Sequence, residues 1–94
     1  MMELRRERPR AARTVETLLR VMEALEEGGK PWSELEARLA GQMSTATLSK
    51  RLKDGLRHGL ITRTLRPDGR VIYELTAKGK AVLEWVRENS KNAI

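Results

Sequence analysis

Residues 41–60 constrain the possible folds more than any other stretch of the chain. Ser44 precedes a run in which leucine recurs every four residues, at Leu48, Leu52 and Leu56. This spacing predicts a helix with one narrow apolar stripe, and Ser44 is placed to cap its first free backbone N–H groups. The opposite face starts small and polar and then becomes basic, with Ala46, Thr47, Lys50, Lys53 and Arg57.

A helix with this outer face meets the requirements of a recognition helix for double-stranded DNA. Its first two turns carry no bulky apolar side chain on the outside. Such a helix can enter the major groove and reach both base edges and phosphates. A second interpretation stays open, in which the helix is a solvated amphipathic one and its lysines only keep the protein in solution.

The composition excludes several kinds of site. The chain has 94 residues, enough for one domain, with no cysteine and a single histidine, His58. Disulfides, zinc–thiolate sites and clustered histidine metal sites are therefore excluded. No catalytic constellation can be assembled from the other residues, so we expect neither an enzyme nor a cofactor.

Two further features of the composition concern where the protein works. No apolar run is long enough for a signal peptide or a membrane span, which leads us to expect a cytoplasmic, nucleoid-associated protein without a membrane partner. Few Asn and Gln residues beside many Arg and Glu residues are typical of a thermophile, here a bacterial or archaeal one.

The charge is distributed unevenly along the chain. Residues 41–73 contain seven basic and two acidic side chains, which supply +5 of the total net charge of +6. Residues 14–40 contain three basic and six acidic side chains, a net −3. One part of the chain is therefore suited to bind a polyanion and another is not, which favours nucleic-acid binding over a role in solubility.

The segment before this basic region predicts a basic arm and one helix. Residues 1–9 are expected to form the arm, and residues 10–27 the first helix, which Gly28 and Gly29 end. Its apolar stripe comprises Ala11, Val15, Leu18, Met22 and Leu25. Val21 and Ala24 lie off that stripe, which indicates either a second face buried in a partner or incidental exposure.

A second short helix precedes the recognition helix. Ser33 and Glu36 match the Ser-x-x-Glu capping box, so the helix is predicted to start at Ser33 and to end at Gly41. Leu35, Leu39 and Ala40 are expected to face inward. Only Gln42 and Met43 then separate Gly41 from Ser44, which predicts a helix-turn-helix with Met43 as the plug of its turn.

A β-hairpin is predicted after the recognition helix. Residues 60–65 and 70–75 have strand character and flank the turn sequence at residues 66–69. Val71, Tyr73 and Leu75 are expected to share one face. Arg63, Arg66 and Arg70 are placed where a wing can hold phosphate or enter a minor groove, although a charged edge that blocks aggregation is an alternative reading.

A last helix is predicted from a cap at Thr76 to about residue 89. Its apolar residues spread around more than one face, which indicates more than one neighbour. We expect it to pack both on the domain and on a second copy of the chain, although a core position is the simpler reading for Trp85. The residues expected at the dimer interface are Val21, Leu83, Trp85 and Val86.

This order of elements is that of a winged helix-turn-helix, a mainly α fold with a small β-hairpin (α+β). It has a three-helix core, a wing and a C-terminal helix, here in residues 10–94. Residues 34–39, the pair Met43-Ser44 with Leu48 and Leu52, residues 59–63 and residues 70–79 resemble the HxlR group of transcriptional regulators, relatives of MarR. The similarity covers about residues 15–86. It implies a homodimer on an operator, with residues 44–53 in the major groove and the wing on an adjacent minor groove.

Three positions depart from the pattern of that group. Pro67-Asp68-Gly69 replaces the usual prolines of the wing, and a reactive N-terminal cysteine found in some members is missing, which removes redox sensing. Gly55-Leu56 stands where a leucine followed by an acidic residue is usual, and glycine within a helix costs about 1 kcal/mol relative to alanine. A small-molecule effector stays open.

Three functions compete at this stage. In the first, a sequence-specific regulator contacts bases and phosphates through the residues Ser44, Thr45, Thr47, Ser49, Lys50, Lys53, Arg57, Arg63, Arg66 and Arg70. In the second, an architectural protein of the same fold binds DNA by charge alone. In the third, the winged helix is a protein-interaction module in a transcription or replication assembly. We favour the first, in which Lys53 and the arginines hold phosphate.

Overall fold

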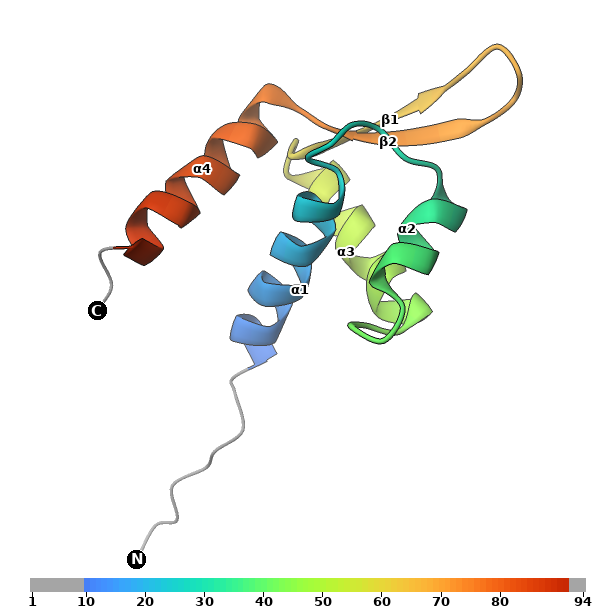
Figure 1. Ribbon diagram of the computed structural model, residues 1–94. Helices are drawn as coiled ribbons and strands as arrows, with labels where there is room; N and C mark the ends of the chain where they lie inside the picture. Colours follow the sequence, from blue (N-terminus) through green and yellow to red (C-terminus); the bar gives the residue numbers. More distant parts are fainter. Residues whose placement is uncertain (1–9, 92–94) are drawn as a thin grey trace, which may run out of the picture.

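Four helices and one hairpin make up the fold, in the predicted order (Figure 1). The elements are α1 (Arg10–Ala24), α2 (Trp32–Leu39), α3 (Thr45–Arg57), β1 (Ile61–Leu65), β2 (Val71–Leu75) and α4 (Ala77–Lys91). The structure is a computed structural model that describes residues 10–91. The winged helix-turn-helix architecture is confirmed. The arm expected at residues 1–9 lies outside the described residues.

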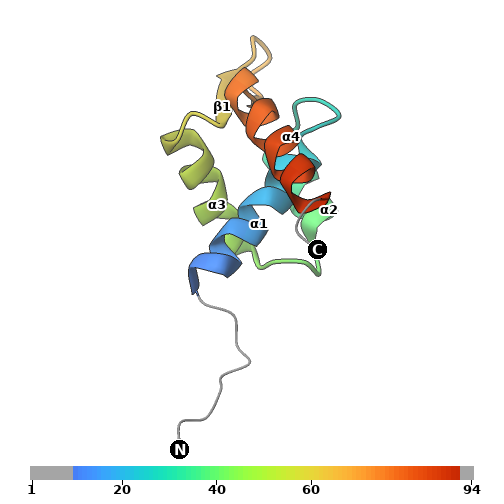
Figure 2. The same ribbon diagram turned by 90° about the vertical axis from the view of Figure 1, so that its left-hand side faces the viewer.

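Helix α1 is the central element of the arrangement. It packs against α2, α3 and α4, and in both views it lies between α3 and α4 (Figures 1 and 2). The hairpin extends away from the helices, and its root joins the end of α3 to the start of α4. This leaves the outer side of α3 uncovered by α4.

The apolar residues of the second half of α1, and Leu25 directly after it, are buried. Val21 and Met22 are completely inaccessible, and Ala24 and Leu25 are nearly so. Val21 and Ala24 therefore do not form an exposed second face, because the other helices of the same chain cover them. The first half of α1 behaves in the opposite way, since Val15 of the predicted inner stripe is 54% exposed.

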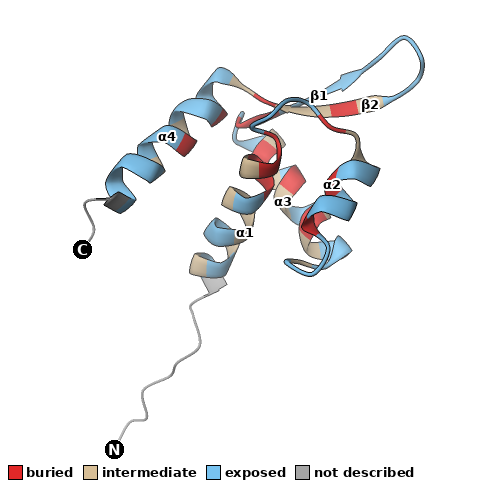
Figure 3. Cartoon of the chain, in the orientation of Figure 1, coloured by how far each residue is buried: buried red, intermediate tan, exposed pale blue. Residues whose placement is uncertain are grey.

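The core is built almost entirely from aliphatic side chains of the helices and of the root of the hairpin (Figure 3). Its buried members are Val21, Met22, Ala24, Leu25, Leu35, Leu39, Leu48, Leu52, Leu60, Ile61, Leu75 and Leu83. The core therefore holds all four helices, the start of β1 and the end of β2 together.

Helix α2 begins one residue earlier than the capping box predicts. Its N-cap is Pro31, whose carbonyl accepts from Glu34 N and Leu35 N at 3.1 Å. Ser33 consequently lies inside the first turn and makes no cap, and the expectation of a Ser33–Glu36 capping box is wrong. Ala40 is also exposed rather than inward, because the chain leaves the helix there.

The turn between α2 and α3 is as tight as expected. The carbonyl of Leu39 accepts from Gln42 N at 2.9 Å and from Met43 N at 3.3 Å. Gly41 has a φ of +85°, a conformation that only glycine adopts without strain. Met43 is half-buried against the core, which confirms its role as the plug of the turn.

The hairpin pairs β1 and β2 antiparallel, with Ile61 opposite Leu75 and Leu65 opposite Val71. One finding was not expected from the sequence. The backbone of Lys30 exchanges two 2.9 Å hydrogen bonds with Tyr73, on the other edge of β2. Ile72 is also buried, although the alternating pattern places it on the face opposite Val71, Tyr73 and Leu75. Gly29, next to Lys30, lies against this face, because a Cβ atom there would stand 2.6 Å from Ile72 Cγ2.

Candidate nucleic-acid interface

The N-terminus of α3 is fixed by Ser44. The Ser44 backbone is extended, and its Oγ accepts from the backbone N–H of Thr47 at 3.1 Å. The same hydroxyl lies 3.1 Å from Thr47 Oγ1 and donates to it. The predicted cap is therefore confirmed, and it orders the first turn of the helix that carries the candidate interface.

Replacing the cap residue gives the first testable expectation. Ser44→Ala should lower the free energy of unfolding by about 1 kcal/mol, because a backbone N–H of α3 loses its partner. Urea unfolding followed by circular dichroism measures the change. Ser33→Ala is the matched control, since Ser33 caps nothing, and it should stay within about 0.5 kcal/mol of the wild type. Equal losses in the two variants would refute this assignment of the cap.

The inner face of α3 packs on the core through Leu48 and Leu52, as predicted. Gly55 lies on the same face, and a Cβ atom there would stand 2.5 Å from Ile61 Cδ1. Its lack of a side chain therefore lets the first residue of the wing pack directly on the recognition helix. The contact gives a structural reason for glycine at position 55.

The outer face of α3 carries the predicted basic residues. Lys50, Lys53 and Arg57 are exposed, and none of them forms an ion pair with any residue in the described part of the chain. The polar residues of the first two turns are also accessible. Ser44 and Thr45 are exposed, whereas Thr47 and Ser49 are half-buried.

Arg51 has a different role from its basic neighbours on α3. Its guanidinium donates to the Asp54 carboxylate at 2.9 Å, and its side chain is only 14% exposed. This ion pair lies within the helix and neutralises the charge of Arg51. The charge offered to a ligand therefore comes from Lys50, Lys53 and Arg57.

The tip of the wing is closed by a compact turn. Arg66 N donates to the carbonyl of Arg70 at 2.7 Å, and Gly69 N donates to that of Arg66 at 2.9 Å. Asp68 accepts from Arg70 N at 3.0 Å and so braces the turn. Both arginine side chains at this tip are exposed.

Arg63 lies nearer to the recognition helix than the two arginines of the tip. It follows Ile61 by two residues in β1, so the two side chains share one face of the strand. Ile61 is the residue that packs on α3, and Arg63 is exposed farther along the same face. The wing and α3 therefore meet at a surface with basic side chains on both elements.

The four residues expected at a dimer interface separate into two groups. Val21 is inaccessible and Leu83 is 2% exposed, and both belong to the core of the chain itself. They therefore cannot offer an exposed surface to a partner without a rearrangement. Trp85 is 65% exposed, which rules out a core position within the chain, and Val86 is half-buried beside it on α4.

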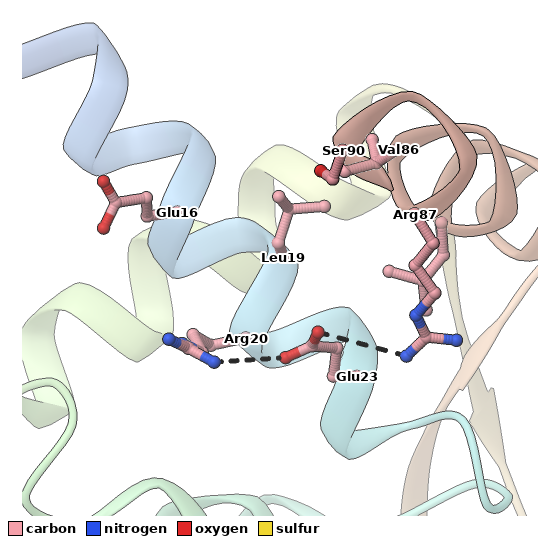
Figure 4. A pocket seen from close by; sticks show the side chains of 8 residues that line it. Glu16, Leu19, Arg20, Glu23, Val86, Arg87 and Ser90 are labelled. Carbon is pink, nitrogen blue, oxygen red and sulfur yellow. Dashed lines mark ion pairs between the residues drawn. The ribbon is translucent and has the colours of Figure 1, made fainter. Parts of the chain in front are cut away.

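Val86 also lines a groove of about 440 Å³ between α1 and α4 (Figure 4). Leu19, Leu83 and Val86 give the groove an apolar lining, and charged side chains surround it. Arg87 donates to both carboxylate oxygens of Glu26, and this hydrogen bonding lowers the pKa of the Glu26 carboxyl below its usual value. The ion pair ties α4 to the end of α1.

His58 is exposed at the end of α3, and its carbonyl accepts from Lys78 Nζ at 2.9 Å. Residues 10–91 contain no group of acidic or histidine side chains arranged to hold a metal ion. None of the described helices is long and apolar enough to cross a membrane.

Known proteins agree with this architecture. The reduced form of the transcriptional regulator YodB from B. subtilis has a TM-score of 0.70 at 24% identity, over 90% of each chain. A probable transcriptional regulator from Pseudomonas aeruginosa has a TM-score of 0.67 at 31% identity, over 80% of this chain and 58% of its own. A putative MarR-family regulator from Enterococcus faecalis V583 has a TM-score of 0.65 at 22% identity, over 95% of this chain and 89% of its own. No curated protein sequence matches.

The match to a family model is more specific than these similarities of fold. The model that describes the HxlR-like helix-turn-helix matches residues 16–92, which include the whole of α2, α3, the wing and α4. This family consists of transcriptional regulators and not of enzymes. The chain belongs to the HxlR-like helix-turn-helix family of transcriptional regulators.

Proposed function

We propose that the protein is a sequence-specific regulator that binds double-stranded DNA in the cytoplasm as a homodimer. The observation that carries the proposal is a set of exposed cations on the outer face of α3 and on the wing, which form no ion pair with residues 10–91. A capped helix that presents short polar side chains first and cations later suits the major groove.

The residues of this surface divide by their position and chemistry. Those assigned to base edges, near the start of α3, are Thr45, Thr47, Ser49 and Lys50, and Ser44 caps the helix that presents them. Those assigned to phosphates, toward the end of α3 and along the wing, are Lys53, Arg57, Arg63, Arg66 and Arg70. Phosphate contacts set the register and most of the affinity, whereas base contacts set the sequence preference.

Exposed apolar side chains on α1 and α4 support the homodimer. Val15 and Trp85 are 54% and 65% exposed, and Leu19 and Val86 line the groove between their helices. Burying such residues against a second copy removes apolar surface from water. Around a two-fold axis, α4 of one protomer can pack on α4 of its partner, or on α1 of its partner. A dimer presents two recognition helices to two half-sites.

Selection of bound sequences from a random DNA pool at physiological salt tests the proposal. Light scattering on the same sample gives the particle mass. An enriched palindrome with half-sites one helical turn apart, together with a dimer mass, is the expected result. Bound but unenriched DNA would identify an architectural protein instead, and no retained DNA would leave the protein-interaction module.

The division between residues that contact bases and residues that contact phosphates makes a separate prediction. Lys50→Ala should relax the sequence preference at one position of each half-site, because it removes a group that touches a base. Arg66→Ala should weaken binding to all sequences about equally and make the salt dependence shallower by about 0.9 log units for each phosphate that the arginine no longer neutralises. Titrations of operator and scrambled DNA at several salt concentrations separate the two effects. Identical behaviour of the variants would refute the division.

A further inference from the structure

Glu36 places a carboxylate beside the start of the recognition helix. It belongs to α2, and its Oε2 atom lies 3.1 Å from the hydroxyl oxygen of Thr45, the first residue of α3. Both side chains are exposed. No cation in the described part of the chain forms an ion pair with Glu36. The N-terminus of α3, which is proposed to enter the major groove, therefore has an acidic group beside it.

This contact determines which hydrogen bonds the Thr45 hydroxyl can still make. An ionised carboxylate only accepts, so Thr45 must donate its single hydroxyl hydrogen to Glu36. The outward side of Thr45 is left with acceptor lone pairs. Thr47 differs, because its hydroxyl oxygen accepts from the Ser44 hydroxyl, and its own hydrogen has no acceptor within the described part of the chain.

We propose that Glu36 is a specificity-determining residue, an inference that rests on the proposed function. Together with Thr45 it forms a surface that accepts hydrogen bonds and donates none. Cytosine and adenine present an exocyclic amino donor in the major groove, whereas guanine and thymine present only acceptors. The pair therefore selects cytosine or adenine at one position of each half-site and rejects guanine and thymine there.

The negative charge of Glu36 also weakens binding to DNA that lacks the preferred base. If the base opposite Glu36 has no amino group, the carboxylate loses its hydration without gaining a hydrogen bond. It is also repelled by the negatively charged DNA. Incorrect sequences are then disfavoured by repulsion as well as by missing hydrogen bonds. Glu36 thus lowers binding to random DNA, although it lies within an otherwise basic interface.

Selection from a random DNA pool with wild type, Glu36→Gln and Glu36→Ala tests this proposal. The wild type should prefer cytosine or adenine at one position by about 10-fold or more over guanine or thymine. Glu36→Ala should lose that preference while the other positions keep theirs. Glu36→Gln carries an amide that can donate, so guanine or thymine should become acceptable there. Thr45→Val should weaken the preference at the same position.

Glu34→Gln is the matched control for the removed charge. Glu34 is exposed on the same helix, two residues and so about 200° away around its axis. This variant should select the wild-type motif. A uniform loss of affinity at all positions in Glu36→Ala would show that Glu36 only supports the α3 terminus, and an unchanged motif in both Glu36 variants would equally overturn the inference. A wild type that enriches no sequence would instead refute the proposed function, and the inference with it.

Discussion

Replacing Trp85 with glutamate is expected to dissociate the homodimer and to weaken binding to a two-half-site operator by about 100- to 10,000-fold. Trp85 is the single aromatic residue of α4, its side chain is exposed, and it lies on the surface proposed to face the second copy. A carboxylate in its place would have to be buried without a partner on both sides of the interface. The separated protomers then bind each half-site independently.

Light scattering and titrations of operator DNA measure the two consequences. Trp85→Phe is the conservative control, because it keeps an aromatic ring and should stay dimeric. The fold of the glutamate variant should survive, since the side chain contributes little to the core of its own chain, and far-ultraviolet circular dichroism verifies this. A glutamate variant that keeps the dimer mass would move the interface away from α4.

Replacing Gly79 with alanine is expected to lower the free energy of unfolding by about 1–3 kcal/mol. A Cβ atom at this position would stand 2.2 Å from the backbone oxygen of Leu60. That oxygen already accepts from Thr76 N at 3.0 Å. Moving it would break this hydrogen bond, which joins the residue before β1 to the residue after β2. The clash outweighs the gain in helix propensity of about 1 kcal/mol that alanine offers.

Thermal unfolding at a fixed protein concentration measures this effect, with a shift of about 4–8 °C for each kcal/mol in a domain of this size. Lys80→Ala is the matched control, because Lys80 is exposed in the same turn of α4. It should leave the midpoint within about 4 °C of the wild type. A Gly79→Ala protein as stable as the wild type would mean that α4 does not need its close approach to Leu60.

The features that the sequence predicts well are those that depend on neighbouring residues. Ser44 and Thr76 cap α3 and α4 as expected, since a cap needs only a side-chain oxygen and the next turn of backbone. The hairpin turn and the leucine stripe of α3 are equally local. The capping box predicted at Ser33 does not form, because α2 starts earlier with Pro31 as its N-cap. Pro31 and the Ser33-x-x-Glu36 motif are two competing start signals, and the motif alone does not show which of them is used.

Which apolar faces are covered, and which distant groups meet, depends on contacts between elements. Val21 and Leu83 are buried in a core to which all four helices and both strands contribute, whereas the periodicity of a single helix shows only that one of its faces is apolar. The approach of Ile61 to Gly55, the pairing of Lys30 with Tyr73 and the contact between Glu36 and Thr45 also join separate elements.

The order of the elements, the caps at Ser44 and Thr76 and the concentration of positive charge on α3 and the wing can be read from the sequence alone. Those properties follow from hydrogen bonds and side-chain spacing within a few residues. The packing of α1 against three other helices determined which apolar side chains remain exposed, and the contact between α2 and α3 engages the Thr45 hydroxyl with Glu36. Burial and hydrogen-bond partners depend on distances between elements that no local pattern of residues contains.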